Sequence, residues 1–65
     1  MQLDDIDHAI LAELQRDGRV SVSDLAVRVS VSRATAYREL TDLADAGLLL
    51  RTGQGRGTRY EIAAP

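Results

Sequence analysis

Arginine supplies all the positive side-chain charge of this sequence, with eight arginines and no lysine. The planar guanidinium group matches phosphate oxygens and the edge of guanine. Arg33 and Arg38 lie in the polar stretch Ser-Arg-Ala-Thr-Ala-Tyr-Arg, residues 32–38. Three more surround a glycine-rich segment near the C-terminus: Arg51, Arg56 and Arg59. A GC-rich coding bias would also favour arginine, so only the positions of these residues indicate recognition of a polyanion.

Groups that could support catalysis or hold a metal are scarce. There is no cysteine, which excludes disulfides and thiolate metal sites. The single histidine, His8, would need several carboxylate partners to form a metal centre, and no nucleophile can be paired with it. A chain of 65 residues also has little material for the walls of a substrate pocket. We therefore expect no enzymatic activity, no metal and no cofactor.

The charges divide unevenly along the chain. Residues 1–24 carry six acidic and two basic side chains, whereas residues 25–65 carry six basic and four acidic ones. This division suggests two faces of opposite potential, although chance could produce a split of this size. The net charge of −2 argues against indiscriminate coating of nucleic acid. Without a basic secretion signal or an apolar run of ~20 residues, we expect a cytoplasmic protein with no membrane partner.

Three helices are expected from capping residues and apolar spacing. The first covers residues 4–17, with Asp4 and Asp7 as a capping pair and an apolar residue every four positions. Gly18 follows its end, where glycine tolerates a left-handed backbone. The surface is the expected place for His8, which lies off the apolar stripe.

The second and third helices are expected at residues 22–29 and 33–46. The Ser-x-x-Asp start signal at Ser21 precedes the second, Ser32 is the N-cap of the third, and Gly47 follows the end of the third. On a helical wheel, one side of the third helix is apolar and forms the expected core face: Ala36, Leu40, Leu43 and Ala44. The opposite side is small, polar and charged: Ala34, Thr35, Arg38, Thr41, Asp42 and Asp45. Only its N-terminal half suits a polyanion, because the aspartates lie in the other half.

Residues 48–62 change to the pattern of a β-hairpin. A glycine-rich turn at 53–57 carries Arg56, and the returning strand alternates so that Tyr60 and Ile62 are expected to face inward. The turn lacks the lysine and the following helix of a phosphate-binding P-loop. The expected fold is therefore mainly α with a small β-hairpin, a three-helix winged helix-turn-helix occupying residues 1–65 as a single domain.

This arrangement is typical of proteins that read double-stranded DNA. An α-helix fits the major groove, its first turns contact the bases, and its free N–H groups favour phosphate. Small residues such as Ala34 and Thr35 would let the helix seat deeply, and Arg38 could pair with guanine or phosphate. An arginine-bearing wing would lie along the backbone or in the adjacent minor groove.

Resemblances to known families cover nearly the whole chain. The N-terminal DNA-binding domain of Lrp/AsnC-type regulators resembles the segment LDDIDHAILAELQRDGRVSVSDLAVRVSVSRATAYRELTDLADAGLLL. The segment SRATAYREL is similar to the recognition helix of IclR-type repressors. The segment GQGRGTRYEI resembles the wing of small winged-helix domains, including those appended to Fic proteins. The sequence departs from the Lrp pattern in two ways. Its 65 residues contain no ligand-binding, oligomerising domain, and Ser30 occupies a position where a turn glycine is often found.

The resemblance implies sequence-specific binding of double-stranded DNA, usually as a dimer. We expect a transcriptional regulator, such as a repressor, that binds a palindromic site as a homodimer and shows no evident small-molecule effector site. The residues expected to contact DNA are Ser32, Arg33, Ala34, Thr35, Tyr37, Arg38, Thr41, Arg51, Gln54, Arg56 and Arg59. The alternative is a winged-helix interaction or dimerisation module of a larger polypeptide, without a DNA site of its own.

Several of these side chains also have purely structural explanations. Arg38 and Asp42 have the spacing of an exposed helical ion pair. Tyr37 could cover the edge of the core, because the chain has no Phe or Trp. Ser32 is in the first place a helix cap, and Arg28 on the second helix is more readily explained as a solvated side chain than as a phosphate clamp.

Overall fold

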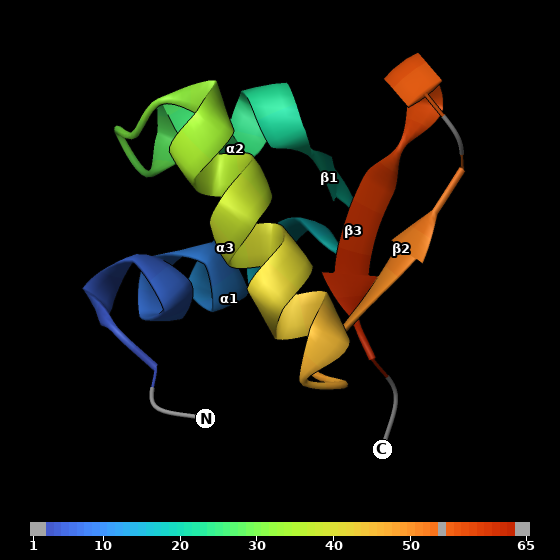
Figure 1. The fold of residues 1–65 in the computed structure, drawn as a ribbon, viewed down its shortest axis with the longest axis horizontal. Helices are drawn as coiled ribbons and strands as arrows, with labels where there is room; N and C mark the ends of the chain where they lie inside the picture. The colour runs from blue at the N-terminus through green and yellow to red at the C-terminus, as the bar shows by residue number, and fades with distance from the viewer. Residues whose placement is uncertain (1–2, 54, 64–65) are drawn as a thin grey trace.

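The computed structural model describes residues 3–53 and 55–63, with Arg56 described by its backbone only. Three helices pack beside an antiparallel sheet with strand order β1-β3-β2, and a short 3₁₀ turn closes the far end of the β2–β3 hairpin (Figure 1). The elements are α1 (Asp5–Asp17), β1 (Val20–Ser21), α2 (Val22–Arg28), α3 (Arg33–Asp45), β2 (Leu49–Thr52), η1 (Gly55–Gly57) and β3 (Arg59–Ile62). This is the winged helix-turn-helix fold expected from the sequence. Within the described ranges, every helix is too short or too polar to cross a lipid bilayer.

Side-chain caps determine where the helices begin. At α1, Asp4 Oδ1 accepts a hydrogen bond from the Asp7 N–H at 2.9 Å, and Asp7 Oδ2 accepts one from the Asp4 N–H at 3.2 Å. Ser21 and Ser32 cap α2 and α3 in the same way, each accepting from the N–H three residues later. Such a cap contributes roughly 1 kcal/mol. The expected capping residues are confirmed, and α1 begins at Asp5 because Asp4 itself has an extended backbone.

The core lies between the three helices and the inner side of the sheet. Tyr60 on the central strand β3 is its largest fully buried side chain. The cluster is completed by apolar residues of every helix and of the outer strands: Ile10, Leu14, Val20, Leu25, Leu40, Leu43 and Leu49. Ala36, Leu40 and Leu43 are buried as the helical wheel predicted, whereas Ala44 is only partly buried. The inner face of α3 is thereby held against the sheet.

The sheet differs from the expected hairpin in two respects. Val20 and Ser21, expected only to be extended, form a third strand that pairs with Tyr60 and Arg59 of β3. Ile62, expected to face inward, is 37% exposed. Because β1 begins at Val20, opposite Tyr60, no strand residue pairs with Ile62 on that side in the described part of the chain.

Two helices end in the same backbone motif with different residues. After α3, Gly47 has φ +83°, and the next N–H, of Leu48, bonds to the Leu43 carbonyl at 3.0 Å. This bond keeps Leu48 in the helix cap, so β2 begins one residue later than expected. After α2, Ser30 takes the glycine position with φ 59°, and the Val31 N–H bonds back at 3.0 Å to the carbonyl of Ala26. The turn between α2 and α3 therefore places a serine where a left-handed backbone favours glycine.

Replacing Ser30 with glycine should raise the free energy of unfolding by about 0.5–1 kcal/mol, because the left-handed strain of ~1–2 kcal/mol is partly offset by the entropy of an added glycine. Urea unfolding followed by circular dichroism measures this change. The matched control is Ser23→Gly, which puts glycine inside α2 and should lower stability by roughly 0.5–1 kcal/mol. A lower unfolding free energy for Ser30→Gly would show that the serine side chain stabilises the turn.

A cluster of carboxylates forms where α1 packs against α3. The Asp7 side chain is 2% exposed, and Glu39 of α3 is partly buried beside it. A hydrogen bond to Asp7, burial and the negative charges of Asp7 and Asp4 raise the pKa of Glu39 to about 7, against the opposing effect of Arg38. Between its ordinary value of 4.5 and about 7, the folded protein therefore holds a proton that the unfolded chain releases.

The free energy of unfolding should therefore fall as the pH rises from about 5 to about 8, because folding then places the ionised Glu39 beside Asp7. A chelator in the buffer keeps divalent cations away from these carboxylates during the measurement. In Glu39→Gln this fall should be clearly smaller, and the variant should be more stable than the parent protein at pH 8. Asp45→Asn removes a charge from the same helix outside the cluster and should keep the parental slope. Equal slopes for Glu39→Gln and the parent protein would exclude Glu39 as the titrating group.

Candidate nucleic-acid interface

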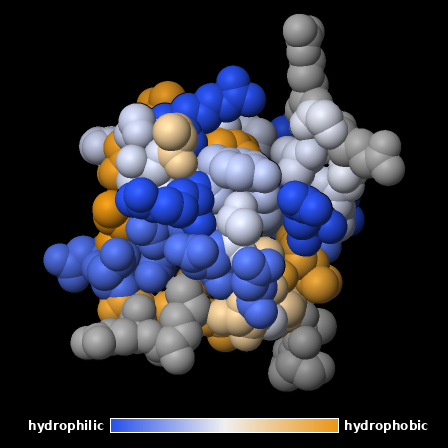
Figure 2. Space-filling view, viewed as in Figure 1, coloured by the Kyte–Doolittle hydropathy of each residue, from blue (hydrophilic) through white to orange (hydrophobic). Residues whose placement is uncertain are grey.

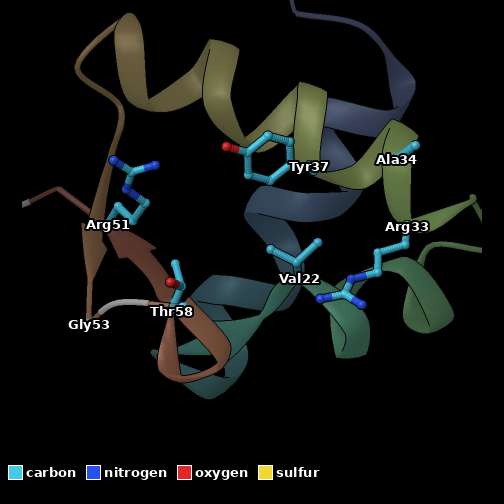
Figure 3. Close-up of a pocket in the computed structure, with 8 residues that line it drawn as sticks. Val22, Arg33, Ala34, Tyr37, Arg51, Gly53 and Thr58 are labelled. Atoms are coloured by element: carbon cyan, nitrogen blue, oxygen red, sulfur yellow. The ribbon is translucent and has the colours of Figure 1, made fainter.

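An open groove of about 720 Å³ separates α3 from the wing, the hairpin of β2, η1 and β3. In Figure 3, the phenol of Tyr37 points across the groove toward Arg51, and Arg33 lies at the other end of the α3 wall. The groove is lined by residues of both helices of the helix-turn-helix and of the wing: Val22, Arg33, Ala34, Tyr37, Arg51, Gly53, Gly55 and Thr58. Predicted contact residues that are far apart in the sequence therefore meet at one surface.

The first turn of α3 is exposed and capped. Ser32 Oγ accepts from the Thr35 N–H at 3.1 Å and donates to Thr35 Oγ1 at 2.9 Å. Thr35 is partly buried, whereas Arg33 and Ala34 are exposed. The hydroxyl groups of Ser32 and Thr35 are hydrogen-bonded to each other, so their main role is to cap the helix.

Tyr37 and Arg38 occupy the second turn of α3 and are both exposed. Tyr37 is 51% exposed, which favours a surface role over the alternative of a core edge. No ion pair joins Arg38 to Asp42 among the residues that the structure describes. Thr41 lies deeper than expected, because its Oγ1 is shielded from solvent, and it lines a smaller hollow beside Leu49 and Tyr60. The exposed surface of α3 is thus concentrated in its first half.

Ion pairs separate the arginines into two groups. On the side of α1, α2 and β1, arginines contact acidic side chains: Arg16 with Glu13, Arg19 with Glu61, and Arg28 with Glu13 and Asp17. The hydrogen bond with Asp17 raises the pKa of Arg28, so this residue is a structural ion-pair partner. Across the described side chains, four other arginines have no such partner: Arg33, Arg38, Arg51 and Arg59. These four lie on α3 and the wing, where their charge is available to a ligand.

The wing requires glycine at its first turn residue. Gly53 has φ +81°, and a Cβ atom there would lie 2.4 Å from the carbonyl oxygen of Gly57. Arg51, two residues before this turn, lines the main groove, while Arg59 and Arg33 line an adjoining hollow of about 130 Å³. In Figure 2, hydrophilic side chains gather on α3 and again over the wing strands, with less polar surface between them.

The structure brings together only part of the predicted site. Four predicted residues line the main groove: Arg33, Ala34, Tyr37 and Arg51. Gln54 lies outside the described residues, as does the side chain of Arg56. Val22 and Thr58 line the groove without having been predicted, because Val22 has the pattern of a core residue and Thr58 that of a strand residue.

Sequence relatives of the chain are regulators. The model of the AsnC-type helix-turn-helix domain matches residues 3–45. The leucine-responsive regulatory protein of Rhizobium meliloti (strain 1021) is 43% identical over 49 residues, and an uncharacterized HTH-type transcriptional regulator of Pyrococcus abyssi (strain GE5 / Orsay) is 41% identical over 49 residues. In both cases the match covers 75% of this chain and 31% of the relative. The chain therefore spans less than a third of the length of these proteins.

Solved structures share the fold. The crystal structure of the AntR antimony-specific transcriptional repressor has a TM-score of 0.79 at 32% identity, covering 88% of this chain and 51% of that one. The Zalpha domain of Carassius auratus PKZ, solved in complex with Z-DNA, has a TM-score of 0.82 at 14% identity, covering 88% and 90%. At that identity, the second likeness concerns the fold alone.

The family match covers α1, α2 and α3 to the last residue of α3, and the wing elements β2, η1 and β3 follow it. The turn between α2 and α3, the capped and exposed start of α3 and the adjacent hairpin are all in place. The chain belongs to the family of AsnC-type helix-turn-helix domains.

Proposed function

We propose that the chain is one winged helix-turn-helix domain, residues 1–65, that binds double-stranded DNA sequence-specifically and regulates transcription. In this proposal α3 enters the major groove and the wing contacts the backbone or the adjacent minor groove. The observation that carries it is the groove flanked on opposite walls by Arg33 and Arg51, neither of which has an acidic partner among the described residues. No cofactor is needed for this activity.

The geometry of α3 supports major-groove entry. Its first turn is exposed, its N–H groups point along the helix toward the capped end, and Ala34 offers little steric resistance. Helix N-termini attract phosphate, and side chains of the first turns reach base edges. Asp42 and Asp45 are exposed further along the helix, where phosphate would be repelled. The contact is therefore expected to involve the first two turns.

Two copies acting on a palindromic site would account for useful affinity from a small domain. A chain of 65 residues offers few phosphate contacts, and each neutralised phosphate contributes to binding in a salt-dependent way. A homodimer doubles these contacts and reads two half-sites. The names of the relatives support a regulator, and the repressor among the structural neighbours makes repression the favoured direction.

On a duplex selected from a random pool, Arg38→Ala should weaken binding by about 1–3 kcal/mol if Arg38 reads guanine. If Arg38 instead contacts phosphate, the loss should be equal across sequences and the salt slope should fall by about one. Fluorescence anisotropy at several salt concentrations distinguishes the two. Arg16→Ala, which removes an arginine paired with Glu13, is the matched control and should bind as the parent protein does. Parental affinity for Arg38→Ala would remove this residue from the interface.

For the wing, Arg51→Ala should lower affinity for all duplexes by a similar factor and reduce the salt slope by about one, because a backbone contact is not sequence-specific. Arg19→Ala, which removes an arginine paired with Glu61 beside the same sheet, serves as the control. Repeating the selection with each variant tests the base preference. A changed consensus for Arg51→Ala would contradict a backbone role.

A protein-interaction or dimerisation module is the second candidate function. The observation that favours it is the group of large apolar side chains left exposed near the end of the sheet: Leu48, Leu50 and Ile62. Retention on random duplex DNA at low salt separates the two functions. Strong self-association without any retention would favour the interaction module over the DNA-binding protein.

A further inference from the structure

Three carboxylates from two helices meet beside the N-terminus of α1. Asp4 caps α1, Asp7 lies in its first turn, and Glu39 reaches the same point from the middle of α3. One oxygen atom of each residue lies within 4.8 Å of an oxygen atom of the other two. Residues more than thirty positions apart in the chain therefore offer oxygen ligands to a common centre.

The capping box uses only half of the oxygen atoms of its two aspartates. Asp4 Oδ1 and Asp7 Oδ2 accept the two N–H bonds at 2.9 and 3.2 Å. Asp7 Oδ1 is left over. When all three carboxylates are ionised, no donor in the described part of the molecule reaches this oxygen, which is buried in a residue that is only 2% exposed. A buried carboxylate oxygen without a partner is costly, so a proton or a cation is expected beside it.

Arginine does not supply that charge. Throughout residues 3–53 and 55–63, the ion pairs of the structure involve Glu13, Asp17 and Glu61, and none includes a member of the cluster. The charged groups that act on Glu39 are Asp4 and Asp7 from α1 and Arg38 from its own helix. The cluster thus concentrates three acidic groups against one basic neighbour.

We propose that Asp4, Asp7 and Glu39 form a binding site for a hard divalent cation. Calcium binds carboxylate oxygens at about 2.3–2.6 Å, so two oxygens on opposite sides of one ion lie up to roughly 5.2 Å apart. The spacing of the three oxygen atoms falls within this span. For magnesium, at about 2.0–2.1 Å, the corresponding limit is roughly 4.2 Å, and water would complete the shell of either ion. The site revises the expectation of no metal, which rested on the missing cysteines and the single histidine.

Carboxylates bind a cation through ionised oxygens, so the site is tested at pH 8. We expect a dissociation constant of about 10⁻⁴–10⁻³ M for calcium, in the range of weak calcium sites.

The test uses the protein without DNA, so its outcome is independent of the proposed function. Manganese chloride is titrated at pH 8 into ¹⁵N-labelled, chelator-treated protein. The amide signals of the first turn of α1 and of the middle of α3 should broaden before all others. In calcium chloride at ten times the dissociation constant, the folding equilibrium constant should rise about tenfold over that in sodium chloride of equal ionic strength.

Glu39→Gln is the decisive variant, because glutamine can still donate a hydrogen bond to Asp7 and thus preserves the packing of α3 on α1. It should lose the local broadening and the calcium effect, whereas Asp45→Asn, with the same change in net charge, should keep both. Broadening spread over the acidic surface, or an equal calcium effect in Glu39→Gln, would overturn the proposal. A sodium control that reproduces the calcium effect would overturn it as well.

Discussion

The burial of one face of α3 against the sheet is the contact on which the rest of the structure depends. Leu40 and Leu43 pack in the same cluster as Tyr60, which lies on the central strand. Because a helix repeats every 3.6 residues, fixing these side chains inward also fixes which residues face outward. The exposure of Arg33 and Arg38 is therefore a consequence of core packing. The same contact joins α3 to β2, the strand that leads into the wing.

The distribution of ion pairs determines which surface of this acidic protein can bind an anionic ligand. The arginines of α1, α2 and the segment before β1 lie within ion-pair distance of acidic groups, so their field largely cancels. Arg33 of α3 and Arg51 of β2 line a groove whose described lining includes no acidic residue. A molecule with a net charge of −2 thus has a local basic surface. The uneven charge along the sequence indicated this, but only the fold shows where the two groups separate.

Local signals in the sequence predict local structure well and distant contacts poorly. The caps Asp4, Ser21 and Ser32 depend on bonds across three residues, and the sequence places them correctly. The pairing of Val20 with Tyr60 joins segments forty residues apart, and two residues are too few to give a strand pattern. The groove and the carboxylate cluster likewise depend on how α3 sits against the wing and α1. Helical periodicity indicates which face is buried but not which element covers it.

The acidic cluster and the proposed DNA surface are coupled because neighbouring residues of one helix serve them. Arg38 and Glu39 follow each other on α3, about 100° apart around its axis, so one reaches solvent and the other α1. The charge of Arg38 lowers the pKa of Glu39, and linkage requires the effect to be mutual. A phosphate at Arg38 would weaken its effect on Glu39 and so favour a proton or a cation in the cluster. Occupancy of the cluster, in turn, removes negative charge beside the helix that would enter the major groove.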